Sequence, residues 1–330
     1  MNSEQVWVTW EEHRRSRELA AAFNARYLPF TSSLPNPFRY AVLGARTLAY
    51  IIRFRPPTIY GQNPSIVLAC LLCLVGRMSR TTIVIDRHTN FYPATRNSPK
   101  LKWKIYHALG YWTDRTADLV IVTNQYLADF VRSEGGNSVV LPDPLPDLAP
   151  STRVYDTNRK GRVVFVASGA EDEPLAAVLQ AVEGIQNVVD LFVTSGRAKR
   201  AAEALPHVAN VTLTGFLPYD SYINLLREAD VIVILTTLDH TLCCGAYEAT
   251  SLQRPMVLSD TQTIKSYFQH GAIYVAPDSV SIAAGIVAAL KNWHALRDAL
   301  ARNDAPMREN WRRAFNVIQK QLPRSMADRT

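Results

Sequence analysis

Segments typical of β-strands alternate with segments typical of helices along almost the whole chain. Short apolar runs such as VWVTW (6–10), TIVID (82–86), LVIV (119–122) and VIVIL (231–235) are each followed by a stretch with helical periodicity. Strands that are separated by helices lie parallel in a sheet that helices cover on its faces. The alternation therefore predicts an α/β fold.

One proline-rich stretch interrupts this alternation. Residues 142–160 (PDPLPDLAPSTRVYDTNRK) carry four prolines and no periodicity, a composition that is typical of a linker. A chain of 330 residues is also long enough for two domains. We expect one α/β domain over 1–150, a second over 151–306, and a C-terminal helix over 307–330, with packing back on the first domain as one option.

Basic residues are concentrated in the first third of the chain. Residues 1–115 hold 16 Lys and Arg against 6 Asp and Glu, in a chain whose formal net charge is +7. Such a surface suits phosphate, nucleic acid or an anionic membrane, and a solvated basic surface without a partner is the alternative. We expect no nucleic-acid partner, because the basic third lacks a recognisable groove-reading motif.

The cysteines and the apolar runs indicate the compartment. Only one CxxC is present (Cys70 and Cys73), and no histidine lies near a cysteine at zinc-ligand spacing, so we expect reduced, mostly buried thiols and no metal. The N-terminus has no basic-then-apolar signal pattern. The apolar run 65–76 is shorter than the roughly 20 residues that a spanning helix needs. We expect a cytoplasmic protein, peripheral on the inner face of the membrane.

Residues 241–259 (TLCCGAYEATSLQRPMVLS) carry the clearest functional signal. They predict a loop, a helix that begins near Gly245 and a strand that begins near Met256. A helix N-terminus suits a phosphate, and the Glu248 carboxylate one turn further in can accept hydrogen bonds from ribose hydroxyls. A nucleotide-sugar site needs this combination. The alternative is an ordinary helix–strand unit in which Glu248 faces solvent.

Two stretches resemble a known class of enzymes. Residues 211–259, from VTLTGF through READV to RPMVLS, resemble the donor-binding domain of GT-B glycosyltransferases, most closely family 4. Residues 60–92 (YGQNPSIVLACLLCLVGRMSRTTIVIDRHTNFY) are similar to the acceptor domain of chitobiosyldiphosphodolichol beta-mannosyltransferases and bacterial polysaccharide glycosyltransferases. The resemblance covers roughly 58–290. It implies two Rossmann-like domains with parallel sheets that face each other across a cleft, and metal-independent hexosyl transfer.

The resemblance also implies a donor site. Backbone groups at the start of the 241–259 helix would bind the diphosphate, Glu248 would bind the ribose, and residues 215–217 would line the base. The chain departs from the family 4 pattern in two places. His240 takes the position of the first glutamate of Glu-x7-Glu, and ASGAEDEP (167–174) lacks the usual Arg and Lys, so Arg197 and Lys199 would meet the phosphates unless they are only surface charges. The expected donor-binding residues are Glu248, Gly245, Cys244, Ala246, His240, Gly215, Phe216, Leu217, Arg197 and Lys199.

Catalytic candidates follow two strands of the first domain. By resemblance, His88 in IDRHTN would contact the donor sugar, with a histidine that caps local backbone as the alternative; Arg87 beside it either faces phosphate or packs. In WEEHRRS, Glu11 or His13 is a candidate base, because histidine titrates near neutrality and a glutamate pKa can be raised. The alternative for this segment is a helix cap with charged residues in its first turn.

The predicted helix 100–115 is a candidate for contact with the acceptor or the membrane, on the basis of its residue types alone. Lysines and aromatic residues interleave along the predicted helix 100–115, with Lys100, Lys102, Trp103 and Lys104 at its start. This composition suits an anionic bilayer surface, and a core-facing aromatic stripe with solvated lysines is the alternative.

Together these features predict a glycosyltransferase. It would move a sugar from a UDP- or GDP-type nucleotide diphosphate sugar, used as co-substrate without a cofactor, to a lipid-linked, oligosaccharide or polysaccharide-precursor acceptor at the membrane surface. Two alternatives stay open: a non-catalytic nucleotide-sugar-binding subunit, and a GT-B nucleotide-sugar epimerase.

Overall fold

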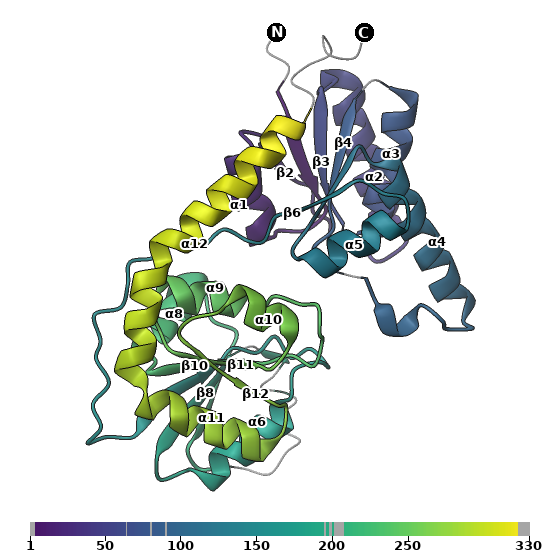
Figure 1. Cartoon of the computed structure of the whole chain (residues 1–330). Coiled ribbons are helices and arrows are strands. Elements are labelled where there is room, and N and C mark those ends of the chain that lie inside the picture. The colour runs from purple at the N-terminus through teal and green to yellow at the C-terminus, as the bar shows by residue number, and fades with distance from the viewer. Residues whose placement is uncertain are drawn as a thin grey trace. The chain divides into compact units, whose positions relative to one another are not determined.

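The chain divides into two compact units in the computed structural model (Figure 1). The first unit comprises Met1–Pro144 and Trp311–Thr330, and the second comprises Leu145–Asn310. The structure describes residues 4–63, 65–79, 81–89, 91–194, 196–197, 200 and 208–322. The changes between units at 144/145 and 310/311 lie close to the boundaries expected from the sequence, 150/151 and 306/307.

A sheet of six parallel strands forms the centre of the first unit, in the order β2-β1-β3-β4-β5-β6. The direction of strand succession reverses between β1 and β3, which makes that point the switch of the sheet. The strands are β1 (Val6–Thr9), β2 (Arg26–Pro29), β3 (Thr58–Gln62), β4 (Thr82–Asp86), β5 (Leu119–Val122) and β6 (Ser138–Val140). The sequence did not reveal β2, because RYLP is short, ends in proline and is only half buried.

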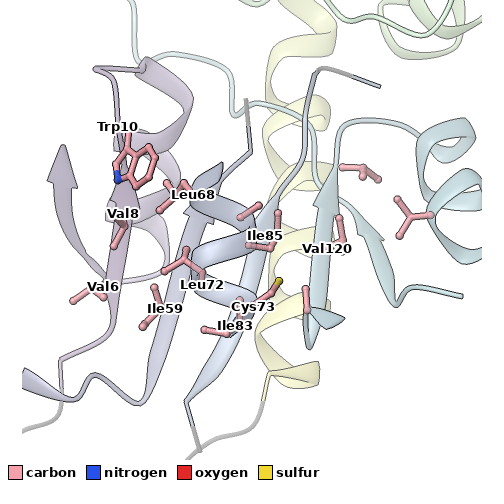
Figure 2. Close-up of a cluster of buried hydrophobic side chains, with 14 of the residues drawn as sticks. Val6, Val8, Trp10, Ile59, Leu68, Leu72, Cys73, Ile83, Ile85 and Val120 are labelled. Carbon is pink, nitrogen blue, oxygen red and sulfur yellow. The ribbon is translucent and has the colours of Figure 1, made fainter. Parts of the chain in front are cut away.

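Helices cover both faces of this sheet. One face packs against α2 (Phe38–Phe54), α3 (Ile66–Met78) and α5 (Gln125–Ser133), with α4 (Leu101–Thr116) beside α3. Leu68 and Leu72 of α3 lie among strand residues such as Val8 and Ile85 in this core (Figure 2). The other face packs against α1 (Arg14–Ala22) and the last turns of α12 (Trp293–Gln321). The short 3₁₀ helix η1 (Pro93–Thr95) precedes α4.

The second unit repeats this design with strand order β12-β11-β10-β7-β8-β9, all parallel. Its switch point lies between β7 and β10. The strands are β7 (Gly161–Phe165), β8 (Val189–Thr194), β9 (Val211–Gly215), β10 (Val231–Ile234), β11 (Met256–Ser259) and β12 (Ala272–Val275). One face packs against α6 (Leu175–Gly184) and α11 (Ser279–Lys291), and the other against α8 (Tyr219–Glu228), α9 (Cys244–Ser251) and α10 (Gln262–Tyr267). The predicted α/β class with two Rossmann-like domains is thus confirmed.

The C-terminal region differs from the expectation. The sequence predicted a separate C-terminal helix over 307–330, but α12 begins at Trp293 and is continuous through Pro306. Proline removes one helical hydrogen bond and usually ends a helix. Here the following turn is fixed by side chains: Arg308 donates to Leu145 O at 3.1 Å, and Trp311 Nε1 donates to Pro142 O at 2.9 Å.

The structure also tests what the sequence predicted about the cysteines and about membrane-spanning helices. All four cysteines are free, but the prediction of mostly buried thiols is wrong for Cys244, which is exposed, while Cys70 and Cys243 are half-buried. Within the described ranges, none of the helices combines the length and the apolar character needed to cross a bilayer.

Candidate functional site

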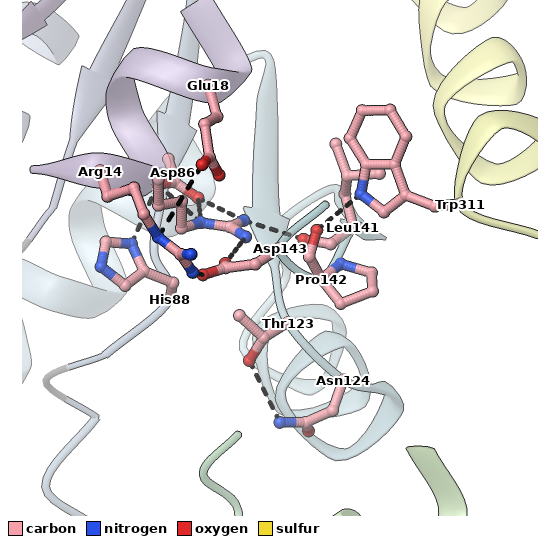
Figure 3. A network of polar contacts seen from close by, with 11 residues as sticks. Arg14, Glu18, Asp86, His88, Thr123, Asn124, Leu141, Pro142, Asp143 and Trp311 are labelled. Atoms are coloured by element: carbon pink, nitrogen blue, oxygen red, sulfur yellow. Dashed lines mark hydrogen bonds and ion pairs between the residues drawn. The ribbon is translucent and has the colours of Figure 1, made fainter. Parts of the chain in front are cut away.

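A buried ion cluster lies at the carboxyl end of β4, where parallel α/β sheets bind ligands. Asp86 ends β4 and is fully buried, and its carboxylate accepts hydrogen bonds from Arg15 Nε at 3.0 Å and Arg15 Nη2 at 2.8 Å. The same guanidinium bonds Asp143 through Nη1 at 2.5 Å and Leu141 O through Nη2 at 2.8 Å. Arg15 thus ties α1, β4 and the loop after β6 together. Its partners Asp86, Leu141 and Asp143 are labelled in Figure 3.

Charge pairing decides the protonation of this cluster. Burial by itself raises the pKa of the Asp86 carboxyl, but the Arg15 guanidinium and His88 outweigh it and hold that pKa well below its usual range. Burial likewise lowers the pKa of Arg15, and the Asp86 and Asp143 carboxylates more than compensate, so its pKa is raised. The cluster is therefore a fixed charged pair, with Asp86 as an ionised acceptor.

His88 is oriented by this carboxylate. Its Nδ1 lies 2.9 Å from Asp86 Oδ2, and an ionised acceptor requires that Nδ1 carry the proton. In the neutral ring Nε2 then holds a lone pair, and no described residue hydrogen-bonds this atom, although it is buried. His88 can therefore accept a proton or a hydrogen bond from a hydroxyl group.

His13 lies directly against His88. The two ring centroids are 4.9 Å apart, and burial together with His88 lowers the pKa of His13 to about 4. His13 is also the N-cap residue of α1, yet its side chain makes no capping hydrogen bond. The capping alternative therefore does not explain its side chain, which stays neutral at pH 7 beside His88.

Glu11 is not part of the ion cluster but lines a cavity of about 110 Å³. This cavity lies at the carboxyl ends of β1 and β3, the switch point of the first sheet. The buried Gln62 contributes its side chain, whose Nε2 has no hydrogen-bond partner among the described groups. The cavity is lined by Trp10, Glu11, Arg39, Tyr40, Gln62 and Ser65. A larger cavity of about 440 Å³ lies at the amino end of β3 against α12, away from this edge.

The structure settles the role of Arg87. Its guanidinium forms a buried ion pair with Asp114 and lies 4.1 Å from the ring centroid of Phe91. Arg87 is therefore a packing residue, and the phosphate-facing alternative is not supported.

In the second unit, Glu248 is buried one turn inside α9. Only 5% of the residue is exposed, so the alternative in which it faces solvent is wrong. Its Oε2 accepts a hydrogen bond of 2.6 Å from Tyr222 Oη of α8. Tyr222 was missed at the sequence level, because a single tyrosine 26 residues away has no pattern that connects it to Glu248.

Close packing explains the glycine at position 245. A Cβ atom at this position would lie 3.0 Å from Val166 Cγ1 and 3.2 Å from Ile234 Cγ1. The first turn of α9 therefore packs closely on the carboxyl ends of β7 and β10. Cys244, Gly245 and Ala246 form this turn, and Cys243 caps it without a side-chain hydrogen bond.

The loop after β7 holds a second functional candidate that the sequence did not reveal. The Glu173 carboxylate accepts hydrogen bonds from three successive backbone N–H groups, Ser168 at 2.8 Å, Gly169 at 2.7 Å and Ala170 at 3.2 Å. Convergent backbone N–H groups bind anions. Here the Glu173 carboxylate of the chain itself occupies this position.

The remaining donor candidates belong to the second unit. Gly215 ends β9 with a φ of 72°, a conformation that favours glycine, and Phe216 after it is 84% exposed. Leu217 packs against the core, and burial lowers the pKa of His240. Arg197 is exposed, and Lys199 lies outside the described residues.

The start of α4 exposes its lysines beside a cluster of aromatic rings. Lys100, Lys102 and Lys104 are exposed, and Lys102 Nζ lies 5.1 Å from the Trp103 ring centroid. Trp103 is half-buried among Tyr92, Tyr106 and His107. The described residues include no group of three or more His, Cys, Asp and Glu side chains placed to hold a metal ion.

The structure thus brings together some of the candidates but not all. His13, His88 and the unpredicted Asp86 and Arg15 form one cluster, while Glu11 belongs to the neighbouring cavity. Glu248 and the first turn of α9 form the core of the donor candidates in the second unit.

We compared the chain with known protein families and with curated proteins. Residues 160–292 match the family model of glycosyl transferases group 1. Comparison with curated protein sequences gave no match.

Several solved structures share the whole fold. Sucrose-phosphate synthase from Thermosynechococcus elongatus matches with a TM-score of 0.76 and 14% identity, over 97% of this chain and 98% of that one. HepE from Anabaena in complex with UDP and glucose matches with a TM-score of 0.73 and 12% identity, over 97% and 99%. A putative UDP-N-acetylglucosamine 2-epimerase from Listeria monocytogenes matches with a TM-score of 0.64 and 13% identity, over 97% and 95%. These likenesses show the GT-B fold, and the match to the glycosyl transferase family model lies within the second unit.

The lowered pKa of His13 makes folding stability depend on pH. Between about 6.5 and about 4 the unfolded state binds a proton at this residue and the folded state does not, so stability falls as the pH falls. The contribution lost by pH 4 is up to about 3 kcal/mol.

Denaturant unfolding of His13→Gln should show a smaller loss of stability between pH 6.5 and pH 4 than the wild type. His270→Gln, at an exposed histidine, is the control. Equal pH slopes in wild type and His13→Gln would contradict the assignment.

Proposed function

We propose that this GT-B chain, whose residues 160–292 form a glycosyl transferase group 1 domain, moves one sugar from a nucleotide diphosphate sugar to a lipid-linked or polysaccharide-precursor acceptor. The main observation in favour of nucleotide-sugar binding is the buried Glu248, which lies one turn inside α9 within the matched domain. The donor would be of the UDP or GDP type. The reaction would take place at the cytoplasmic face of a membrane, without a cofactor.

The geometry of α9 supports nucleotide binding. The helix begins at the carboxyl end of the sheet beside the switch point, and its first-turn N–H groups suit a diphosphate. The Glu248 carboxylate can accept ribose hydroxyls in addition to the bond from Tyr222. HepE, which shares the fold, has been solved with UDP and with UDP-glucose, and this favours the UDP type.

The first unit supports the acceptor half. In the reaction the acceptor hydroxyl oxygen bonds to C1 of the sugar, the bond between C1 and the diphosphate oxygen breaks, and the hydroxyl proton passes to a base. Nε2 of His88 is an oriented acceptor for a hydroxyl of the donor sugar or of the acceptor. Glu11 lines the neighbouring cavity, which also contains the Arg39 guanidinium, a group suited to an acceptor phosphate.

Two rival functions have their own support. The structural likeness to a putative UDP-N-acetylglucosamine 2-epimerase favours an epimerase, which would convert its nucleotide sugar without an acceptor. His240 in place of a glutamate and Glu173 in the loop after β7 favour a non-catalytic binding subunit. Incubation of UDP- and GDP-sugars with and without a polyprenyl diphosphate-linked acceptor separates the three. Nucleotide diphosphate released only with acceptor supports transfer, an epimeric sugar supports the epimerase, and binding without turnover supports the subunit.

Glu248→Gln should weaken nucleotide binding at least about tenfold, because hydrogen bonds to a charged acceptor contribute about 1.5–3 kcal/mol. The measurement is thermal unfolding with UDP, GDP, ADP and TDP in parallel. A nucleotide at about 100 times its dissociation constant stabilises the wild type by about 2.7 kcal/mol. Glu183→Gln, at an exposed glutamate of α6, is the matched control. If nucleotides stabilise Glu248→Gln as much as they stabilise the wild type, Glu248 does not bind the donor.

His88→Ala should reduce kcat by at least about 100-fold while the dissociation constant for the nucleotide changes little, since the ring serves the reacting groups rather than the nucleotide. Steady-state transfer assays, paired with calorimetric titration of the nucleotide, check this split. His270→Ala in the second unit is the control. An unchanged kcat would remove His88 from the site.

A further inference from the structure

The exposed charges of α2, α3 and α4 are all positive. Between Glu18 and Asp114 the sequence contains 12 Lys and Arg but a single acidic residue, Asp86. Asp86 is fully buried in the ion cluster with Arg15. The described surface of this stretch therefore presents no carboxylate to a partner.

The outward face of α2 is apolar. The helix buries Leu43, Thr47 and Ile51 against the sheet. Its exposed side follows the spacing of one helical face and is made of Phe38, Ala41, Val42, Ala45, Ala49 and Ile52. Phe38 is 66% exposed and Ile52 is 70% exposed. A solvated surface helix normally has charged and polar residues there, so this face lacks its partner.

Helices α3 and α4 extend this apolar surface. They are neighbours: a Cβ at Gly44 of α2 would lie 3.9 Å from Leu71 of α3, and Cys73 Sγ of α3 lies 3.7 Å from Thr113 O of α4. The three helices carry the labels α2, α3 and α4 in Figure 1. Their further exposed apolar side chains are Val67, Leu74 and Met78 of α3 and Leu101, Ile105 and Leu109 of α4.

Basic side chains flank the apolar ones on each helix. Arg46 and Arg53 lie along one edge of the exposed stripe of α2, Arg77 lies in the last turn of α3, and Lys102 and Lys104 lie in the first turn of α4. Apolar side chains surrounded by Lys and Arg are the composition that enters the interfacial region of an anionic bilayer.

We propose that the outward faces of α2, α3 and α4 form one docking surface for an anionic lipid bilayer, which we name the α2–α4 face. Phe38, Val42 and Ile52 enter the interface between headgroups and acyl chains, while the flanking arginines and lysines contact anionic headgroups. This inference deepens the proposed function and rests on it for the lipid-linked nature of the acceptor.

The same charges argue against other occupants. A second copy of the chain would bring two sets of arginines together with no carboxylate to pair them, which is unfavourable. A nucleic acid would engage the cations but leave the aliphatic side chains of α2 and α3 unpartnered.

Helix α2 also connects this surface to the candidate acceptor site. Its first turn supplies Arg39 and Tyr40 to the cavity that contains Glu11. Arg39 Nη2 in addition donates to Trp10 O at 2.9 Å and so holds the loop after β1. A diphosphate group projecting from the bilayer would reach this cavity from the end of the docked helix.

The test is vesicle co-sedimentation of the full chain. Vesicles of phosphatidylcholine alone are compared with vesicles that contain about 30% phosphatidylglycerol, at low and high salt. The wild type should partition onto the anionic vesicles and be released by salt. Arg53→Gln with Arg77→Gln should weaken partitioning about 25-fold, about fivefold for each charge removed. Phe38→Ser with Ile52→Ser should weaken it at least tenfold.

Matched controls lie on the second unit. Lys291→Gln with Arg302→Gln makes the same change in net charge, and Val280→Ser with Val287→Ser removes two exposed valines from α11. Both should bind as the wild type does. Absence of wild-type binding, or equal binding by all variants, would overturn the α2–α4 face. Two further outcomes would also overturn it. One is sedimentation of the protein without lipid that the α2 variants abolish, and the other is binding of a nucleic acid in place of vesicles that the same variants abolish.

The nucleotide readout keeps the two proposals separate. Thermal stabilisation by UDP or GDP in the absence of vesicles reports on the second unit and should be the same in all four double variants. Nucleotide stabilisation without vesicle binding overturns the docking surface alone. Vesicle binding without nucleotide stabilisation overturns the donor assignment alone.

Discussion

The pairing of Arg15 with Asp86 and Asp143 is the constraint on which the candidate site of the first unit depends. These charges are almost completely buried, and each partner comes from a different element. Removal of one partner of a buried pair typically costs 3–5 kcal/mol, because the other charge stays buried without compensation. The cluster therefore fixes α1, β4 and the loop after β6 in one arrangement. It also keeps Asp86 ionised, and this sets the proton of His88 on Nδ1.

The carboxyl edge of the second unit is organised by packing and by an internal anion. Close contact of Gly245 with Val166 and Ile234 sets the first turn of α9 against the sheet. Glu248 is then buried against Tyr222 instead of facing solvent. The loop after β7 closes around the Glu173 carboxylate, so its N–H groups are already satisfied. The two units share a strand topology, but the carboxyl edges of their sheets are stabilised by different forces.

Sequence periodicity predicted the fold and the position of the main candidates, but not what surrounds them. Strand β4 and helix α9 are local patterns, so His88 and Glu248 could be placed at sheet edges from the sequence alone. The partners of these residues could not. Arg15, Asp86 and Asp143 are far apart in the chain, and ion pairing between them is a tertiary contact with no local pattern. The orientation of α2 is a similar case. Its sequence shows an amphipathic helix, but only packing reveals that Leu43 and Ile51 face the core while Phe38 and Ile52 face outward.

The Asp86 carboxylate orients His88 so that Nε2 is free to act as a hydrogen-bond acceptor. Long-range ¹H–¹⁵N NMR of the protein labelled with ¹⁵N-histidine, assigned with His88→Ala, reports the tautomer of each ring directly. We expect the neutral ring of His88 to carry its proton on Nδ1, with Nε2 unprotonated, and Asp86→Asn to disturb this preference. A neutral His88 with its proton on Nε2 in the wild type would contradict the account, because the atom that faces away from Asp86 would then be a donor.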